Sequence, residues 1–118
     1  MPGDSRLRLT KRDDVTIVEF IDRNILDEGN IQAIGEELGA IIDAAPQPRL
    51  LISFANVDHL SSAALGTLIT VNNKIKARGG RLVLANIDEQ IFDVFRITRL
   101  DRLFQIREST DLALKALA

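Results

Sequence analysis

Residues 57–68 join a predicted buried strand to a predicted helix and read Val57-Asp58-His59-Leu60-Ser61-Ser62-Ala63-Ala64-Leu65-Gly66-Thr67-Leu68. The apolar run from Leu50 to Phe54 before them is typical of a strand buried on both faces. After them, apolar residues recur at helical spacing. Two serines therefore stand at the start of a helix. A serine there can cap the helix by accepting a hydrogen bond from a backbone N–H, and the positive end of the helix dipole can also accommodate a phosphate.

The residues after this junction predict further alternation of strands and helices. Gly79-Gly80 should end the helix, because glycine readily adopts the left-handed conformation at a helix C-terminus. We expect a strand at 81–85, a helix capped by Asp88, a short edge strand at 103–107 and a last helix capped by Ser109. Phe92, Phe95 and Phe104 are predicted core residues.

The residues before the junction predict a hairpin and one helix. Leu7 and Leu9 alternate with polar residues, and a second apolar run lies at 15–20 after a charged turn, so we expect two paired strands. A polar connection at 22–30 leads to a helix that ends before Pro46. The apolar face of that helix consists of Ile31, Ile34, Leu38, Ile41 and Ile42.

This order of elements predicts an α/β fold. Residues 1–118 should form a single domain, with 1–5 as a loose tail. Because helices lie between the later strands, we expect a mixed β-sheet in which the N-terminal hairpin is antiparallel and the later strands form parallel βαβ units. About four helices should cover this sheet.

Composition excludes several classes of protein. The chain has 118 residues, a net charge of −2, no cysteine and one histidine. We therefore expect no disulfide, no metal site, no cofactor and no nucleic-acid surface. No apolar run approaches the ~20 residues of a membrane span, so we predict a soluble cytoplasmic protein without membrane insertion.

The sequence offers little support for catalysis. His59 lies close to Ser61 and Ser62, but the Gly-x-Ser-x-Gly pattern of a nucleophile elbow is absent, and the chain has no second histidine. It also contains neither a P-loop nor a Gly-x-Gly-x-x-Gly sequence. We therefore predict no catalytic residue and no enzyme activity.

The run Leu60-Ser61-Ser62-Ala63-Ala64-Leu65-Gly66 resembles the Asp-Ser-Ser-Gly-Leu-Gly signature of STAS domains, the bacterial anti-sigma factor antagonists. The resemblance extends from about Leu7 to Leu117 and includes Ile25-Leu26-Asp27 and Gly79-Gly80. It implies a single α/β domain that binds an anti-sigma factor whose serine kinase domain phosphorylates one serine. Phosphorylation would break the complex, and a serine phosphatase would restore it.

The resemblance also implies roles for individual residues. Alignment on Leu65-Gly66 places the phosphoacceptor at Ser62, whereas Ser61 occupies the position of the family's aspartate and remains an alternative acceptor. The implied partner-binding residues are Asp27, Asp58, Ser61, Ser62, Ala63, Ala64 and Gly66.

Simpler interpretations remain open at each position. Ser62 could be a helix cap only, Asp27 a turn residue, and Asp58 and His59 solvated loop residues. Arg96, Arg99 and Arg102 recur every third residue, which on one helix would form a basic stripe facing solvent or a partner. The alternative function is a non-phosphorylated STAS scaffold or adaptor in a stress-signalling or lipid-transport complex.

Overall fold

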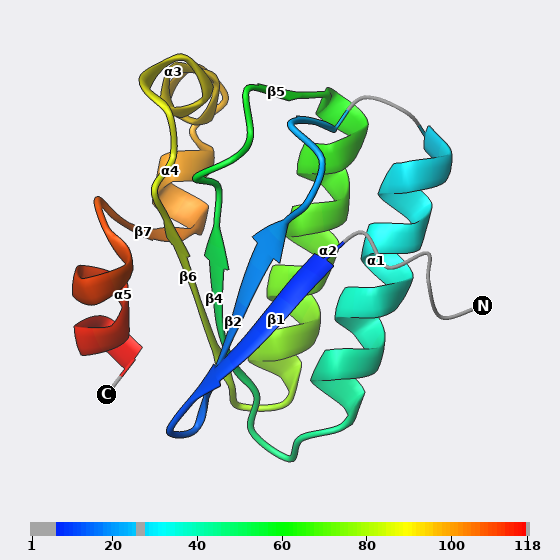
Figure 1. Ribbon diagram of the computed structural model, residues 1–118, viewed down its shortest axis with the longest axis vertical. Helices are drawn as coiled ribbons and strands as arrows, with labels where there is room; N and C mark the ends of the chain where they lie inside the picture. The colour runs from blue at the N-terminus through cyan, green and yellow to red at the C-terminus, as the bar shows by residue number, and fades with distance from the viewer. Residues whose placement is uncertain (1–6, 26–27, 118) are drawn as a thin grey trace.

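The central sheet of the domain has five strands in the order β1-β2-β4-β6-β7. The computed structural model describes residues 7–25 and 28–117. Figure 1 shows the sheet with α1 and α2 on one face and α5 on the other. The strands are β1 (Leu7–Arg12), β2 (Val15–Phe20), β4 (Arg49–Ser53), β6 (Arg81–Ala85) and β7 (Gln105–Arg107). β1 and β2 are antiparallel, and each later strand is parallel to its neighbour, which confirms the predicted mixed sheet.

The sheet is apolar on both faces because helices cover both. Alternate residues of a strand point to opposite faces. On one face, residues such as Val18, Ile52 and Leu84 pack under α1 (Glu28–Asp43) and α2 (Ser62–Ala77). On the other, residues such as Leu51 and Val83 pack under α5 (Thr110–Leu117). This two-sided burial explains why four of the five residues from Leu50 to Phe54 are apolar.

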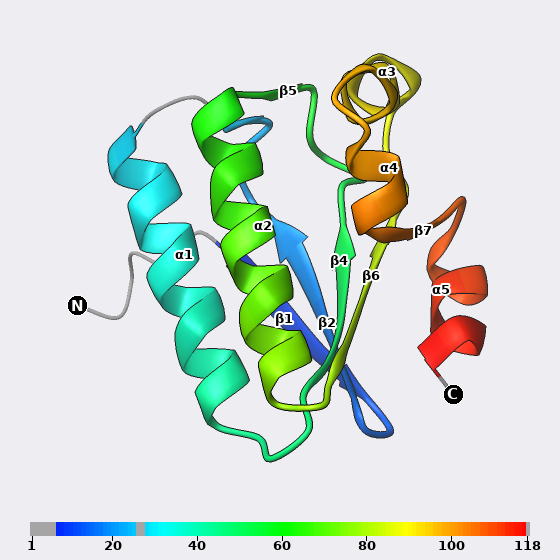
Figure 2. The same cartoon turned by 180° about the vertical axis from the view of Figure 1, so that it is seen from behind.

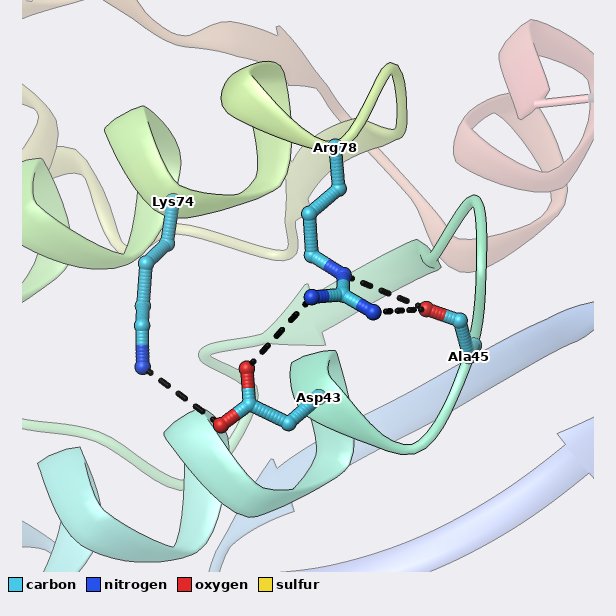
Figure 3. A network of polar contacts seen from close by, with 4 residues as sticks. All are labelled: Asp43, Ala45, Lys74 and Arg78. Carbon is cyan, nitrogen blue, oxygen red and sulfur yellow. Dashed lines mark hydrogen bonds and ion pairs between the residues drawn. The ribbon is translucent and has the colours of Figure 1, made fainter.

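A polar network joins the C-terminal ends of α1 and α2 (Figure 3). The Asp43 carboxylate lies 3.8 Å from Lys74 Nζ and 3.8 Å from a guanidinium nitrogen of Arg78. The Arg78 guanidinium also donates hydrogen bonds of 3.3 and 3.1 Å to the Ala45 carbonyl oxygen. These side chains are exposed, so the network orients the helix ends and adds little to stability.

The structure adds elements that the sequence did not predict. A second, two-stranded sheet pairs β3 (Asn24–Ile25) in parallel with β5 (His59–Leu60), where we expected only connections. The segment after Asp88 contains two helices, α3 (Glu89–Ile97) and α4 (Leu100–Leu103), so the described residues hold five helices where we expected about four.

The expectation that Arg96, Arg99 and Arg102 share one helix is wrong. Arg99 adopts a left-handed conformation with φ of 62° and separates α3, which carries Arg96, from α4, which carries Arg102. The three arginines therefore form no continuous stripe. Within residues 7–25 and 28–117, no helix combines the length and apolar character required to cross a membrane.

Candidate functional site

The predicted serine pair lies where β5 meets α2, and Ser61 is the cap of that helix. Ser61 has extended backbone angles, φ −82° and ψ 164°. Its Oγ accepts a hydrogen bond of 3.2 Å from the Ala64 N–H, and its carbonyl oxygen accepts one of 3.1 Å from the Leu65 N–H. The Ser61 hydroxyl therefore satisfies a backbone donor of the first turn that would otherwise lack a partner.

Ser62 is the first residue of α2, and its side chain is exposed. Its hydroxyl makes no hydrogen bond to any residue that the structure describes. The interpretation that Ser62 is only the helix cap is wrong, because Ser61 holds that position. The two neighbouring serines thus differ: one hydroxyl is engaged in the backbone of the helix, and the other is available to solvent.

No acidic side chain in the first turn of α2 balances the partial positive charge at the N-terminus of this helix. The first turn of α2 contains no acidic residue, whereas its last turns carry Lys74 and Lys76. The N-terminal backbone N–H groups carry a partial positive charge, and carboxylates or phosphates nearby are stabilised by it. The domain can therefore hold a phosphate at Ser62 without a change of fold.

Small residues surround Ser62 on the exposed side of the helix. Ala63 and Gly66 are exposed, and a Cβ built at Gly66 would have no atom within 4 Å. Ser62 and Gly66 are four residues apart and therefore share one face of α2. The Ala64 methyl is different, because it is only 5% exposed and packs in the core, so it offers no side-chain surface.

Asp58, in the loop before β5, forms an ion pair with Arg23. The Asp58 carboxylate lies 3.0 Å from Arg23 Nε, and the backbone N–H groups of Asp58 and His59 both donate to the Arg23 carbonyl oxygen. These contacts hold the start of β5 beside the residue that precedes β3. No local sequence pattern indicated Arg23, because the two charged residues are 35 positions apart. Asp27 lies outside the described residues.

An apolar surface on α3 lies next to the junction, and sequence reasoning missed it. Val94 is 39% exposed and Ile97 is 81% exposed. A small hollow of about 120 Å³, lined by Asp58, His59, Leu60, Gln90, Ile91 and Val94, connects α3 with β5. Val94 and Ile97 are three positions apart, so the sequence already indicated that they share one face of a helix. The sequence did not indicate that this face is exposed.

Comparison with known proteins agrees with this architecture. The model of the STAS domain family matches residues 6–113. BtrV of Bordetella bronchiseptica, which is named as an anti-sigma factor antagonist, is 24% identical over 94 residues, which cover 80% of each chain.

Among solved structures, an anti-sigma factor antagonist (STAS) domain protein from Planctomyces limnophilus superposes with a TM-score of 0.85 and 22% identity, and the match covers 94% of this chain and 97% of that one. The phosphorylated form of Bacillus SpoIIAA superposes with a TM-score of 0.71 and 16% identity, and this match covers 95% and 99% of the two chains. The family match spans most of the sequence and includes both serines and all five strands of the main sheet. The chain therefore belongs to the STAS domain family.

Proposed function

We propose that this domain is an anti-sigma factor antagonist that acts by partner switching. In the unphosphorylated form it binds an anti-sigma factor serine kinase, and phosphorylation of Ser62 by that kinase releases it. A serine phosphatase returns the domain to the binding form. The observation that carries this proposal is the exposed, unpaired Ser62 hydroxyl at the start of α2, directly after a residue that already caps the helix.

A single phosphate is sufficient for such a switch. It adds about −1.5 to −2 charges and three strong acceptor oxygens. Within the domain, the N-terminus of α2 stabilises this charge. In an interface fitted to a small neutral hydroxyl, the same group introduces bulk, a desolvation cost and repulsion from any acidic group of the partner. A penalty of about 3 kcal/mol would weaken binding more than a hundredfold.

The proposed contact surface is the exposed start of α2 with the residues around it. Ser61, Ser62, Ala63 and Gly66 form its centre, where small side chains allow close approach of a partner. Asp58 enters the proposal as an acidic residue four positions before Ser62, and Asp27 enters it from the sequence resemblance only. The Ala64 side chain is left out because it is buried.

The names of the relatives support this assignment at the level of general role. BtrV is named as an anti-sigma factor antagonist, and SpoIIAA has been solved in both unphosphorylated and phosphorylated forms. By the same reasoning, the domain is the substrate of a kinase and not a catalyst, and it acts in the bacterial cytoplasm, where sigma factors function.

Phosphorylation by candidate serine kinases of the anti-sigma type tests the proposal. The domain, Ser62→Ala and Ser61→Ala are each incubated with kinase and ATP, and intact mass is measured before the site is mapped. We expect one added phosphate in the wild type and in Ser61→Ala, and none in Ser62→Ala. Loss only in Ser61→Ala would move the acceptor to Ser61. If a kinase binds the domain firmly but adds no phosphate, the switch is wrong and the adaptor function replaces it.

A further inference from the structure

A second hollow lies at the opposite end of α2 from Ser62, beside the open edge of β6. β7 pairs only with Val83 to Ala85, so the first two residues of β6, Arg81 and Leu82, have no strand on that side. Residues of α2, β6, α4 and the start of β7 line a hollow of about 300 Å³ there. Figure 2 shows these four elements from the side of the molecule that α1 and α2 cover. We call this volume the β6-edge hollow; its lining is Asn72, Lys76, Gly80, Arg81, Leu82, Arg102, Leu103, Phe104 and Gln105.

The charged groups around the β6-edge hollow are all positive. Lys76 comes from α2, Arg81 from β6 and Arg102 from α4, and no aspartate or glutamate contributes to the lining. None of the three cations forms an ion pair with a carboxylate in the part of the chain that the structure describes. In a chain whose net charge is −2, this is a local concentration of uncompensated positive charge.

Two neutral amide side chains lie beside the hollow, and that of Gln105 presents hydrogen-bond donors to it. Arg81 donates a hydrogen bond of 3.3 Å to Gln105 Oε1, which leaves the amide N–H groups of Gln105 for another acceptor. Asn72 is only 3% exposed, and its Nδ2 has no hydrogen-bond partner among the described residues. A buried donor without a partner costs about 1–3 kcal/mol. Because this nitrogen is fully buried, it does not face the hollow, and Gln105 is the side chain that offers neutral donors there.

We propose that the β6-edge hollow binds a small phosphomonoester. The phosphate dianion would lie among Lys76, Arg81 and Arg102 and accept hydrogen bonds from the side-chain amide of Gln105. The organic part would lie against Leu82, Leu103 and Phe104, which are the apolar residues of the lining. A volume of about 300 Å³ is at the small end of ligand pockets, so the ligand carries one phosphate and a compact body.

This binding site is independent of the proposed phosphoacceptor. Lys76 lies 14 residues after Ser62 on the same helix, which corresponds to about 21 Å along its axis. A ligand in the hollow therefore does not contact the start of α2. Failure of the phosphomonoester proposal would leave partner switching at Ser62 untouched, and the reverse is also true.

Titration followed by amide NMR tests the proposal, with phenyl phosphate as the probe. We expect saturable shifts at the side-chain amide of Gln105 and at the backbone of 102–105, without shifts at Ser61 and Ser62. Phenol tests the contribution of the ring alone, benzoate tests a single negative charge, and inorganic phosphate tests the anion without a body. Phenyl phosphate should bind about tenfold or more tightly than each of these three compounds.

Variants that remove one positive charge distinguish a specific binding site from general attraction of anions. Arg81→Gln and Arg102→Gln should each weaken phenyl phosphate binding about tenfold, because each removes one charge-assisted hydrogen bond. Lys115→Gln removes the same charge from an exposed position on α5 and should bind like the wild type.

Two results would overturn the proposal. One is the absence of saturable shifts at 102–105 with phenyl phosphate in the wild type. The other has two parts: inorganic phosphate and phenyl phosphate bind with equal affinity, and Lys115→Gln weakens this binding as much as Arg81→Gln does. That result would indicate an adventitious ion only.

Discussion

The two serines at the start of α2 have separate physical roles, and their substitution should separate stability from modification. Ser61→Ala removes the hydroxyl that accepts from the Ala64 N–H and should lower the free energy of unfolding by about 1 kcal/mol. Ser62→Ala should change it by less than about 0.5 kcal/mol, because the Ser62 hydroxyl makes no internal hydrogen bond. Urea unfolding of both variants measures the difference. An equal loss in both would contradict this division of roles.

Gly66 is also informative at the scale of single residues. Alanine is favoured over glycine inside a helix by about 1 kcal/mol, and a Cβ at this position meets no atom of the domain. Gly66→Ala should therefore raise the free energy of unfolding by about that amount.

On the proposed surface, the same methyl group should weaken binding of the partner kinase at least about tenfold, because it separates two closely approaching surfaces. Asn73→Ala is the control, because Asn73 is exposed on α2 outside this surface, so it should stabilise the helix without loss of binding. Unchanged kinase affinity in Gly66→Ala would remove this glycine from the interface.

At the scale of elements, the turn after α2 is restricted by the approach of another segment. A Cβ at Gly80 would lie against the Pro48 carbonyl oxygen, and the neighbouring Arg81 N–H donates to that same oxygen at 2.9 Å. Gly80→Ala should therefore lower the free energy of unfolding by more than about 2 kcal/mol, because backbone would have to shift.

Gly79 provides a comparison at the same turn. It has φ of +72°, but a Cβ there would make only an ordinary contact, 3.7 Å from the Gln47 side-chain nitrogen, so Gly79→Ala should cost only about 1 kcal/mol. Thermal unfolding of the two variants checks this order, and a smaller loss in Gly80→Ala than in Gly79→Ala would contradict it.

Elements with strong periodicity were predictable from the sequence, and elements defined by distant pairing were not. The helix of residues 31–42 and the buried strand at Leu50 carry long or continuous apolar patterns, and the structure confirms both. β3 and β5 are two residues long and exist because they pair across the fold, so they have no pattern of their own. Arg99 ends α3 by a left-handed backbone conformation that nothing in the arginine spacing indicated.

At the scale of the whole molecule, a chain of aromatic rings links the site to the far edge of the sheet. The ring centroids of Phe20 and Phe54 are 5.3 Å apart, those of Phe54 and Phe95 are 6.4 Å apart, and those of Phe95 and Phe104 are 5.8 Å apart. Phe95 is fully buried on α3 and, together with the buried Ile91, holds this short helix over the carboxyl end of the sheet.

Phe95→Leu should lower the free energy of unfolding by about 2 kcal/mol and accelerate amide hydrogen exchange in α3 more than in α2. Phe92→Leu is the control, because Phe92 is only half-buried on the same helix and contacts the Arg96 guanidinium at its ring face. A uniform increase in exchange over both helices would show that α3 does not open separately.

The assignment of cap and acceptor to adjacent residues has a consequence for how such domains can change over generations. Where one serine performs both tasks, a substitution such as Ser→Ala that abolishes the modification also weakens the helix, so the two properties are coupled. Here the Ser61 hydroxyl caps the helix, whereas the Ser62 hydroxyl makes no hydrogen bond that stabilises it. A lineage can therefore gain, lose or replace the hydroxyl that we propose as the phosphoacceptor without passing through unstable intermediates.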